Sequence, residues 1–380
     1  MHQINGLARE LATGMSLVDN HCHSIDLSVF DLEGFEDHLT EAPDRLSAAT
    51  TPFDSMAGLN LLNLCAPLIG VDGAGPEAYV NARQKIASDE LARMHFGRAG
   101  VELLLVDTGY KESRLATNDQ LAELSGAPVA PILRLETFAE GVLREIARPE
   151  DFAVQFGEAL RDASIKHSGF KSIAAYRCGL ALRGEPVEMA ELSTAVAATI
   201  EGSSTAEGPR ISAEPLVSYL VQTALEVADK PIQFHVGYGD PDLQLDRSNP
   251  ALLTPFIRMA NERRRNIVLL HCYPYHREAA YLAHSFPNVY FDLGLAINFV
   301  GTFASRIFSE AMELAPFAKL LYSSDAYALS ELHLLGSLGF RSAVADFLSM
   351  LYDRRLVDEA YMVRLASMFA KENALRAYRL

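Results

Sequence analysis

Eight short, almost entirely apolar segments recur along the chain, and most of them are separated by stretches with helical periodicity. Short strands of this kind need cover on both faces, which favours parallel pairing with helices packed on each side. Eight such units close naturally into a (β/α)8 barrel. We therefore predict an α/β fold of the TIM-barrel type. The segments begin near residues 17, 101, 129, 169, 231, 266, 288 and 319.

The beginning of the chain departs from this rhythm. After the first apolar segment, residues 24–98 contain no convincing strand and have helical character, so we predict a helical insertion between the first and second strands. In a barrel, such an insertion emerges at the catalytic face and can cap it. Beyond the last apolar segment the chain is again helical. Because no repeat, low-complexity tract or linker interrupts the pattern, we predict one domain over residues 1–380.

An open, doubly wound sheet is the structural alternative to the barrel. That fold would place a glycine-rich phosphate-binding turn directly after the first strand. The sequence at this point is Asn20-His21-Cys22-His23, which contains no glycine. The barrel is therefore the preferred prediction.

Composition and charge limit the partners of the chain. The sequence has 33 basic and 49 acidic residues and a net charge of −16, the opposite of the basic surface that nucleic acid or an anionic membrane requires. The four cysteines form no Cys-x-x-Cys pair, and the N-terminus lacks a signal-peptide pattern. No apolar run approaches the ~20 residues of a membrane helix. We expect a cytoplasmic homo-oligomer that acts on a small molecule.

Potential metal ligands follow four of the predicted strands. His21 and His23 end the first strand, and their spacing places both side chains on one face of an extended chain. Two histidines at this spacing also occur by chance, so the prediction depends on the later strands. Those strands end in His235, His271 and Asp325. Because chemistry in such barrels lies at the carboxyl ends of the strands, we expect the five side chains to converge.

These residue types are suited to a catalytic divalent metal. Neutral imidazoles hold a Zn²⁺-like ion and leave a position open for water, and the ion lowers the pKa of that water to about neutral. A carboxylate beside the water can orient it and accept its proton. We predict one or two Zn²⁺ ions, with another divalent metal as the alternative, and Asp325 as a ligand or as the base.

Lys171, in the fourth predicted strand, has three candidate roles. It can be an ordinary strand-end lysine that pairs with an acid or reaches solvent. It can be carboxylated by CO₂, which would create an anion able to bridge two metal ions. It can also be an unmodified ammonium that binds a substrate carboxylate. The number of metal ions depends on which role holds.

The sequence around these residues resembles the amidohydrolase superfamily and, within it, the amidohydrolase-2 group. The superfamily resemblance rests on His21-x-His23, His235, His271 and Asp325, which agree in strand order. A narrower resemblance, over residues 15–375, is to the amidohydrolase half of FluG-like proteins and their free-standing bacterial relatives. The motifs that carry it are Asp19-Asn20-His21-Cys22-His23, Gly169-Phe170-Lys171-Ser172, Tyr176-Arg177-Cys178-Gly179-Leu180, and Tyr322-Ser323-Ser324-Asp325 with Glu331.

The resemblance implies a distorted (β/α)8 barrel that hydrolyses an amide or similar bond at a metal site. His21, His23 and His235 would be ligands, His271 a ligand or catalytic residue, and Asp325 a ligand and proton shuttle. The association with FluG-like proteins suggests a γ-glutamyl or other amino-acid-derived amide as substrate. We do not extend the ligase activity of glutamine synthetases to this chain, because no sequence of the glutamine-synthetase type occurs in it.

Substrate-binding residues are expected near the same strand ends. Arg177 is suited to capture a substrate carboxylate through two hydrogen bonds, and a structural ion pair is its alternative role. Glu136 ends the third strand as a candidate polar contact or partner of an arginine, and Tyr238 follows the fifth as a candidate pocket residue. Cys22 and Cys272 adjoin expected ligands but should point away from them, so we expect buried thiols.

Two other functions remain open from the residues alone. The same site could serve a metal-dependent decarboxylase or lactonase, because a fold does not fix a reaction. A barrel that keeps the histidines could also be a non-catalytic binding or regulatory protein, and such a protein should purify without metal.

Overall fold

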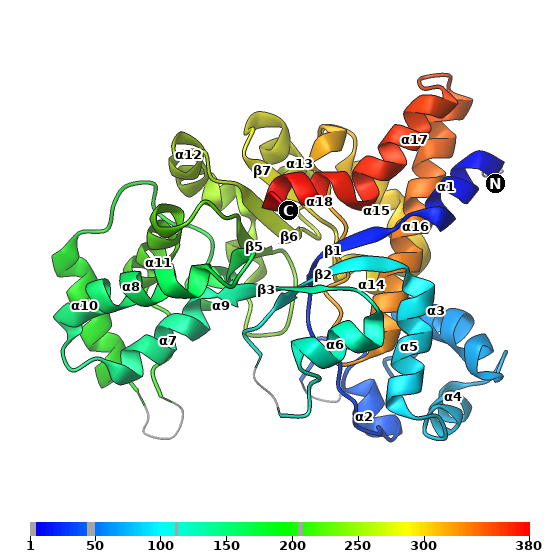
Figure 1. The fold of residues 1–380 in the computed structure, drawn as a ribbon, viewed down its shortest axis with the longest axis horizontal. Helices are drawn as coiled ribbons and strands as arrows, with labels where there is room; N and C mark the ends of the chain where they lie inside the picture. The colour runs from blue at the N-terminus through cyan, green and yellow to red at the C-terminus, as the bar shows by residue number, and fades with distance from the viewer. Residues whose placement is uncertain (1–4, 44–49, 111–112, 204–207) are drawn as a thin grey trace.

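A computed structural model describes residues 5–43, 50–110, 113–203 and 208–380. Seven parallel strands form a single sheet whose spatial order follows the order of the chain. The strands are short and mostly buried, with helices between them, which confirms the predicted α/β class of TIM-barrel type (Figure 1). The strands are β1 (Leu17–Cys22), β2 (Val101–Asp107), β3 (Val129–Arg134), β4 (Gly169–Ser172), β5 (Ile232–Val236), β6 (Ile267–His271) and β7 (Val289–Phe291).

The prediction of a regular eighth strand is wrong. Segment 320–326 forms no named strand, and a single bridge joins its first residue to Phe291 in β7. Its backbone nevertheless bonds to both edges of the sheet. The Leu321 N–H donates to the Phe291 carbonyl at 2.9 Å, and the Asn20 N–H of β1 donates to the Tyr322 carbonyl at 2.9 Å. The segment therefore lies between β7 and β1, in the position of an eighth strand.

Side chains interrupt the regular pairing of this segment. The Ser324 N–H donates to the Asp19 carboxylate at 3.0 Å instead of to a main-chain carbonyl, and the Ser324 hydroxyl donates to the same carboxylate. Asp325 has a φ of 49°, in the left-handed region that an extended strand does not use. The apolar pattern of the sequence reveals neither feature.

The predicted helical insertion is present between β1 and β2. Its elements are α2 (Leu32–Glu36), α3 (Met56–Cys65), η1 (Ala66–Ile69), α4 (Pro76–Arg83) and α5 (Ser88–Ala99). In Figure 1, α3, α4 and α5 gather at one end of the molecule. A buried ion pair, with Arg83 Nε 2.6 Å from Glu331 Oε1, ties the insertion to the long helix α16 (Ser330–Asp353). The Tyr79 hydroxyl donates to the same carboxylate.

The remaining crossover helices cover the outside of the sheet. They are α6 (Asn118–Ser125), α7 (Leu135–Glu145), η2 (Pro149–Asp151), α8 (Phe152–Ser164), α9 (Ala174–Arg177), α10 (Met189–Glu201), α11 (Glu214–Val227), η3 (Leu245–Ser248), η4 (Pro250–Leu253), α12 (Thr254–Glu262), α13 (His276–Ser285), α14 (Ala296–Val300), η5 (Gly301–Phe303), α15 (Ala304–Ala311) and η6 (Phe317–Lys319). In Figure 1, α7, α8, α10 and α11 form a group at the end away from the insertion.

The chain termini complete the core. The N-terminal helix is α1 (Gly6–Gly14), and the chain ends in α17 (Glu359–Ser367), the π-helical turn Met368–Glu372 and α18 (Asn373–Tyr378). Ala374, Ala377 and Tyr378 of α18 pack in one buried cluster with strand residues such as Val18 and Leu270. Among the helices in the described ranges, only α16 is long and apolar enough to pass a membrane-span test, and most of it is buried inside the fold.

Candidate active site

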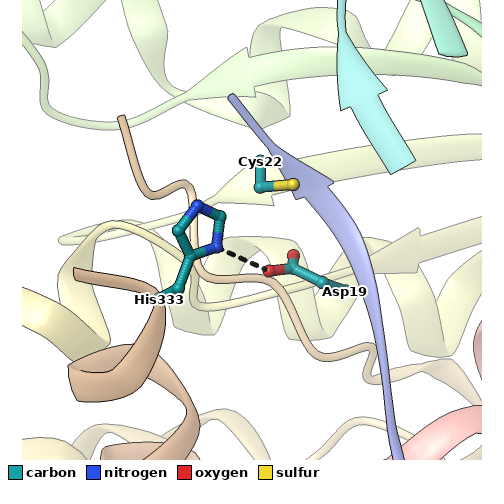
Figure 2. A group of neighbouring side chains, drawn as sticks. All are labelled: Asp19, Cys22 and His333. Atoms are coloured by element: carbon teal, nitrogen blue, oxygen red, sulfur yellow. Dashed lines mark ion pairs between the residues drawn. The ribbon is translucent and has the colours of Figure 1, made fainter. Parts of the chain in front are cut away.

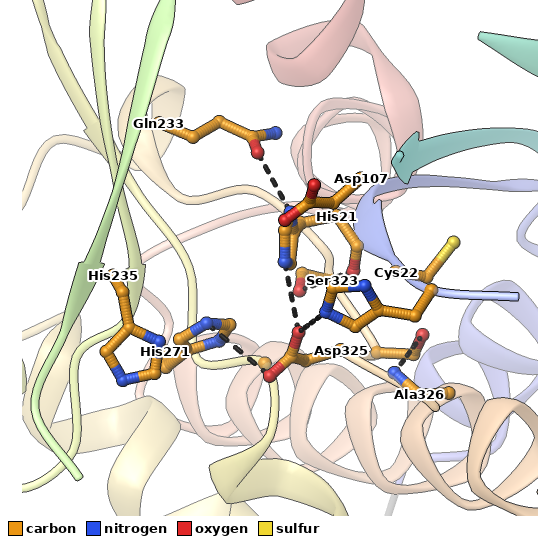
Figure 3. Close-up of polar contacts among 12 residues, drawn as sticks. His21, Cys22, Asp107, Gln233, His235, His271, Ser323, Asp325 and Ala326 are labelled. Carbon is orange, nitrogen blue, oxygen red and sulfur yellow. Dashed lines mark hydrogen bonds and ion pairs between the residues drawn. The ribbon is translucent and has the colours of Figure 1, made fainter. Parts of the chain in front are cut away.

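Five side chains predicted as ligands meet at the carboxyl ends of the strands. Figure 3 shows His21, His235, His271 and Asp325 among them. His21 belongs to β1 and His23 follows it, His235 belongs to β5, His271 ends β6, and Asp325 lies in the segment between β7 and β1. The ring centroid of His21 lies 5.1 Å from that of His23 and 5.5 Å from that of His271. The rings of His271 and His235 are 4.7 Å apart. Residues from opposite ends of the chain thus share one site.

Asp325 lies at the centre of this cluster. Its Oδ1 atom is 3.1 Å from His21 Nε2 and 3.4 Å from His23 Nε2. Its Oδ2 atom is 3.4 Å from His271 Nε2. One carboxylate therefore faces three imidazoles with its two oxygens.

The hydrogen bond to Gln233 decides which ring nitrogen of His21 carries the proton. Its Nδ1 lies 2.8 Å from Gln233 Oε1, which is an acceptor, so Nδ1 carries the proton. The orientation of the Gln233 amide is fixed because its nitrogen donates to the Asn20 carbonyl and the Tyr378 hydroxyl. The lone pair on His21 Nε2 therefore points at the Asp325 carboxylate across 3.1 Å. Two lone pairs at this distance repel each other unless a cation lies between them.

His235 and His271 are also held from outside the cluster. His235 Nε2 lies 3.0 Å from the Tyr238 carbonyl, so this nitrogen donates and Nδ1 keeps the lone pair. The backbone N–H of His271 donates to the Asp292 carboxylate at 2.7 Å. His271 also has a φ of 68°, a strained value for a residue other than glycine, and such strain gathers at functional sites.

Burial keeps the imidazoles neutral. Removal from water, reinforced by the charge of Lys171, lowers the pKa of His21 to about 4 and that of His235 to about 3. Burial also lowers the pKa of His271 well below its ordinary value. Neutral nitrogens beside a carboxylate are the donor set that a zinc-like ion requires.

Several buried atoms of the cluster have no hydrogen-bond partner within the described part of the chain. They are His21 Nε2, His23 Nδ1, His271 Nδ1 and Asp325 Oδ1. Buried polar atoms in folded proteins are normally satisfied, and a bound ion can satisfy those that lack a protein partner. His21 Nε2 and Asp325 Oδ1 face each other at 3.1 Å, so one ion beside them would satisfy both, and the donor types of the cluster fit a divalent metal ion.

The cluster opens into a cavity of about 290 Å³, a volume suited to a small molecule. Tyrosines and charges of both signs form its walls. Besides the five clustered residues, those that line it include the tyrosines Tyr110, Tyr176 and Tyr327, the cationic side chains Arg134, Lys171, Arg177 and Arg210, and the acids Glu41, Asp240 and Asp242.

Lys171 reaches this cavity from β4 and is 2% exposed. Burial lowers the pKa of its ammonium to about 8. Within the described ranges no acid forms a direct ion pair with it, although Asp107 and Asp325 lie near enough to favour its charged form. Among the described residues, Lys171 therefore does not form the ion pair with an acid that the sequence allowed.

The three predicted substrate-binding residues lie in different environments: Arg177 lines the cavity, whereas Glu136 and Tyr238 do not. Arg177 lines the cavity, but its Nη1 is 2.8 Å from Glu140 Oε1, so the structural ion pair considered from the sequence is present. Glu136 does not line the cavity and instead accepts hydrogen bonds at the end of β4, from Ser172 and from the next backbone N–H. Tyr238 also lies outside the lining and contributes its carbonyl to His235.

Sequence reasoning missed Asp107, at the end of β2. Its carboxylate lies within 4.8 Å of ligand atoms of His21 and His23. Arg134 Nη2 approaches it to 2.6 Å, and although burial would raise the pKa of Asp107, this arginine holds it far below its usual value. The sequence could have indicated Asp107 as a site residue, because it ends a predicted strand, as His235 and His271 do.

Two supporting residues were also missed. Gln233 fixes the tautomer of His21, and Asp292 accepts hydrogen bonds from the His271 N–H and the Asn20 amide. Asp292 ends the seventh predicted strand and carried the same signal as Asp107. Gln233 lies inside a strand, where nothing in the local sequence distinguishes it.

Comparison with known families and proteins gives a consistent picture. A family model described as amidohydrolase matches residues 204–380. Protein fluG of Emericella nidulans is 29% identical over 373 residues, covering 88% of this chain and 42% of the fungal protein. The chain thus spans about two fifths of the length of this relative.

Solved structures show the same fold over nearly the whole chain. A "putative metal-dependent hydrolase" from Lactobacillus casei is 32% identical, with a TM-score of 0.88, and the match covers 99% of this chain and 98% of that one. A uronate isomerase from Bacillus halodurans has a TM-score of 0.66 at 14% identity, covering 98% and 95% of the two chains. The second similarity concerns the fold alone.

Proposed function

The chain belongs to the amidohydrolase family, and on that premise we propose that it is a metal-dependent hydrolase of small amides. The observation that carries the proposal is the meeting of four imidazoles and the Asp325 carboxylate at one cavity. Family membership supports hydrolysis and a divalent metal. The proposal goes beyond family membership in naming zinc as the metal and an amide as the substrate.

Zn²⁺ would be held by His21, His23, His235, His271 and Asp325. The neutral imidazoles and the lone pair of His21 Nε2 that faces Asp325 Oδ1 support this assignment. When bound, the ion supplies Lewis acidity and lowers the pKa of a water molecule to about neutral.

Asp325 handles the proton in this proposal. Its carboxylate can accept a proton from the attacking water and pass it to the leaving nitrogen. His271 positions the carboxylate, because its Nε2 lies 3.4 Å from Asp325 Oδ2 and its own backbone is fixed by Asp292.

The substrate class that we propose is a γ-glutamyl or other amino-acid-derived amide. An amino-acid group carries a carboxylate and an ammonium, and the cavity offers partners for both. Arg134 and Arg177 line the cavity but are already paired with Asp107 and Glu140, whereas the Lys171 ammonium has no direct ion pair among the described residues. Glu41 has no cationic partner among the described residues, and burial, with the nearby charges of Asp325 and Asp240, raises its pKa to about 7. The similarity to Protein fluG supports the same class.

Carboxylation of Lys171 would provide an anion for a second ion. CO₂ reacts with the neutral amine, and the lowered pKa of about 8 makes that form more abundant at neutral pH than in an exposed lysine. Intact-protein and peptide mass spectra should show the added mass of one CO₂ on Lys171. An unmodified lysine together with a single metal per site would support the ammonium role instead.

The proposal is tested by removing and restoring metal while assaying a panel of amides. The chelated protein should lose turnover, and Zn²⁺ should restore it. Among the panel, γ-glutamyl amides should be hydrolysed faster than uncharged amides of equal size. Release of CO₂ instead of an amine would indicate a decarboxylase, and a protein that purifies and remains without metal would contradict the proposal.

A further inference from the structure

Behind the candidate active site lies a second group of potential metal ligands. Asp19, Cys22 and His333 each offer a ligand atom, and these atoms all lie within 4.8 Å of one another. All three residues are buried. Figure 2 shows the His333 imidazole and the Asp19 carboxylate facing each other, with Cys22 beside them. The group shares no residue with the predicted catalytic ligands.

An irregularity in the backbone of β1 brings the side chains of Asp19 and Cys22 to the same side of the strand. In a regular strand, residues three apart such as Asp19 and Cys22 point to opposite faces. The pairing of β1 with β2 shifts register between these two residues, as at a β-bulge. Bulges re-aim side chains in this way. His333 reaches the same place from the first turn of α16.

His333 is the residue that points to a ligand. It is fully buried, and neither ring nitrogen has a hydrogen-bond partner of ordinary geometry among the described residues. The His23 backbone is a weak hydrogen-bond partner of the imidazole, and the ring of Phe96 lies beside it. At least one ring nitrogen is left without a partner among the described residues, which is costly in the interior unless an ion or another group lies beside it.

The other two side chains can still accept an ion. The Asp19 carboxylate takes hydrogen bonds from the Ser324 N–H and hydroxyl and from the His21 N–H, yet its Oδ2 atom is 4.0 Å from His333 Nδ1. The Cys22 thiol has one weak contact, to the Leu105 carbonyl at 3.7 Å. Tetrahedral zinc would hold nitrogen and oxygen ligands roughly 3.4 Å apart. The separation of Asp19 and His333 is thus about half an ångström longer than this, and the Cys22 sulfur lies within 4.8 Å of a ligand atom of each.

We propose that Asp19, Cys22 and His333 form a second, structural site for a zinc-like ion. The mixed sulfur, nitrogen and oxygen set suits Zn²⁺, or Co²⁺ in its place, better than Mg²⁺ or Ca²⁺. On binding, the Cys22 thiol becomes a thiolate ligand and its proton is released to solvent. The ion would fasten the start of α16 to β1, the strand that carries His21. The proposal does not depend on the catalytic role of the other cluster.

The thiolate gives this site a signature that the catalytic cluster lacks. The predicted catalytic ligands donate only nitrogen and oxygen, so Co²⁺ there gives no band from sulfur. Protein stripped with chelator and reloaded with Co²⁺ should show a near-ultraviolet thiolate-to-cobalt charge-transfer band. Cys22→Ser and His333→Gln should each remove the band and lower bound zinc by one ion per chain. Cys65→Ser and Cys272→Ser, which alter other buried thiols, should retain both.

X-ray absorption of the zinc-loaded wild type provides a test that needs no variant. With one ion at each of the two sites, it should report a sulfur neighbour at about 2.3 Å with an average of about one sulfur for every two zinc ions. A wild type with neither a charge-transfer band nor a sulfur neighbour would overturn the proposal, as would a band that survives Cys22→Ser. An active protein without the band would reject this site alone, whereas an inactive protein with the band would reject only the proposed hydrolase.

Discussion

At the scale of single residues, His21 shows how one hydrogen bond sets a chemical role. Gln233 accepts the proton on Nδ1, and this leaves Nε2 as a lone pair aimed at Asp325. Burial keeps the ring uncharged. The same residue in water would exchange tautomers and titrate near neutral pH. The neighbours of His21 thus leave it in the state that the proposed metal site needs.

Replacing Gln233 tests this reasoning. Gln233→Met keeps the length of the side chain but removes the acceptor for His21 Nδ1. Partners of this kind contribute about 10–100-fold to metal affinity, so the zinc dissociation constant measured by chelator competition should rise by that factor. Gln233→Glu, which restores an acceptor, should keep the affinity within a few-fold of the wild type. Equal affinities in all three proteins would contradict the assigned tautomer.

Asp325→Asn tests the proton-transfer role. The amide keeps the size of the side chain but cannot accept a proton, so kcat should fall by roughly 10²–10⁴-fold. Circular dichroism and the melting temperature should remain close to those of the wild type. Asp151→Asn, at the exposed ion pair with Arg148, is the matched control and should leave kcat unchanged. Turnover retained in Asp325→Asn would remove this residue from the mechanism.

At the scale of elements, the insertion after β1 is locked to α16 by charge as well as by packing. Arg83 and Glu331 are both buried, and the Tyr79 hydroxyl and the ring of His95 lie beside the same carboxylate. A buried ion pair is expensive to break from one side, because the remaining charge stays in the interior. Helix α4 of the insertion is therefore held against the start of α16.

Breaking this pair should destabilise the protein strongly. Arg83→Met leaves Glu331 buried without its cation and should lower the free energy of unfolding by about 3–5 kcal/mol. Arg93→Met breaks an exposed pair with Glu123 and should cost less than about 1 kcal/mol. Urea unfolding of the two variants measures the contrast. Similar losses in both would show that the buried pair has no special role.

The same pair makes stability depend on pH. Burial would raise the pKa of Glu331, but Arg83 and then His95 lower it from 4.5 to about 2 in the folded state. A folded pKa below the unfolded one stabilises the protein above pH 4.5, and this contribution is lost as the pH falls toward 2. The difference corresponds to about 3 kcal/mol. Arg83→Met should therefore flatten the fall in unfolding free energy between these pH values.

At the scale of the whole molecule, metal binding and folding should be linked. The proposed ligands come from β1, β5, β6 and the segment after β7, which are distant parts of the sheet, and the unfolded chain does not present them together. An ion held at about 1,000 times its dissociation constant stabilises the folded state by about 4 kcal/mol. Chelation should lower the melting temperature, and zinc should restore it. Calorimetry with and without chelator gives the shift, and no shift would show that the ion binds weakly or not at all.

The sequence by itself determined the class of fold, because short apolar segments spaced by helices have few ways to bury both faces. It also placed His21, His23, His235 and His271 at the ends of segments that form strands, and Asp325 in a segment that takes the position of an eighth strand. Asp107 and Asp292 also end predicted strands, but they were not predicted to be site residues.

Only the tertiary structure decided the irregular eighth segment, the tautomer of His21 and the meeting of Asp19, Cys22 and His333. Each of these depends on a contact between residues far apart in the chain or on a local backbone distortion. Hydrophobic periodicity reports which side of an element is buried, but it contains no information about which polar atoms face each other inside.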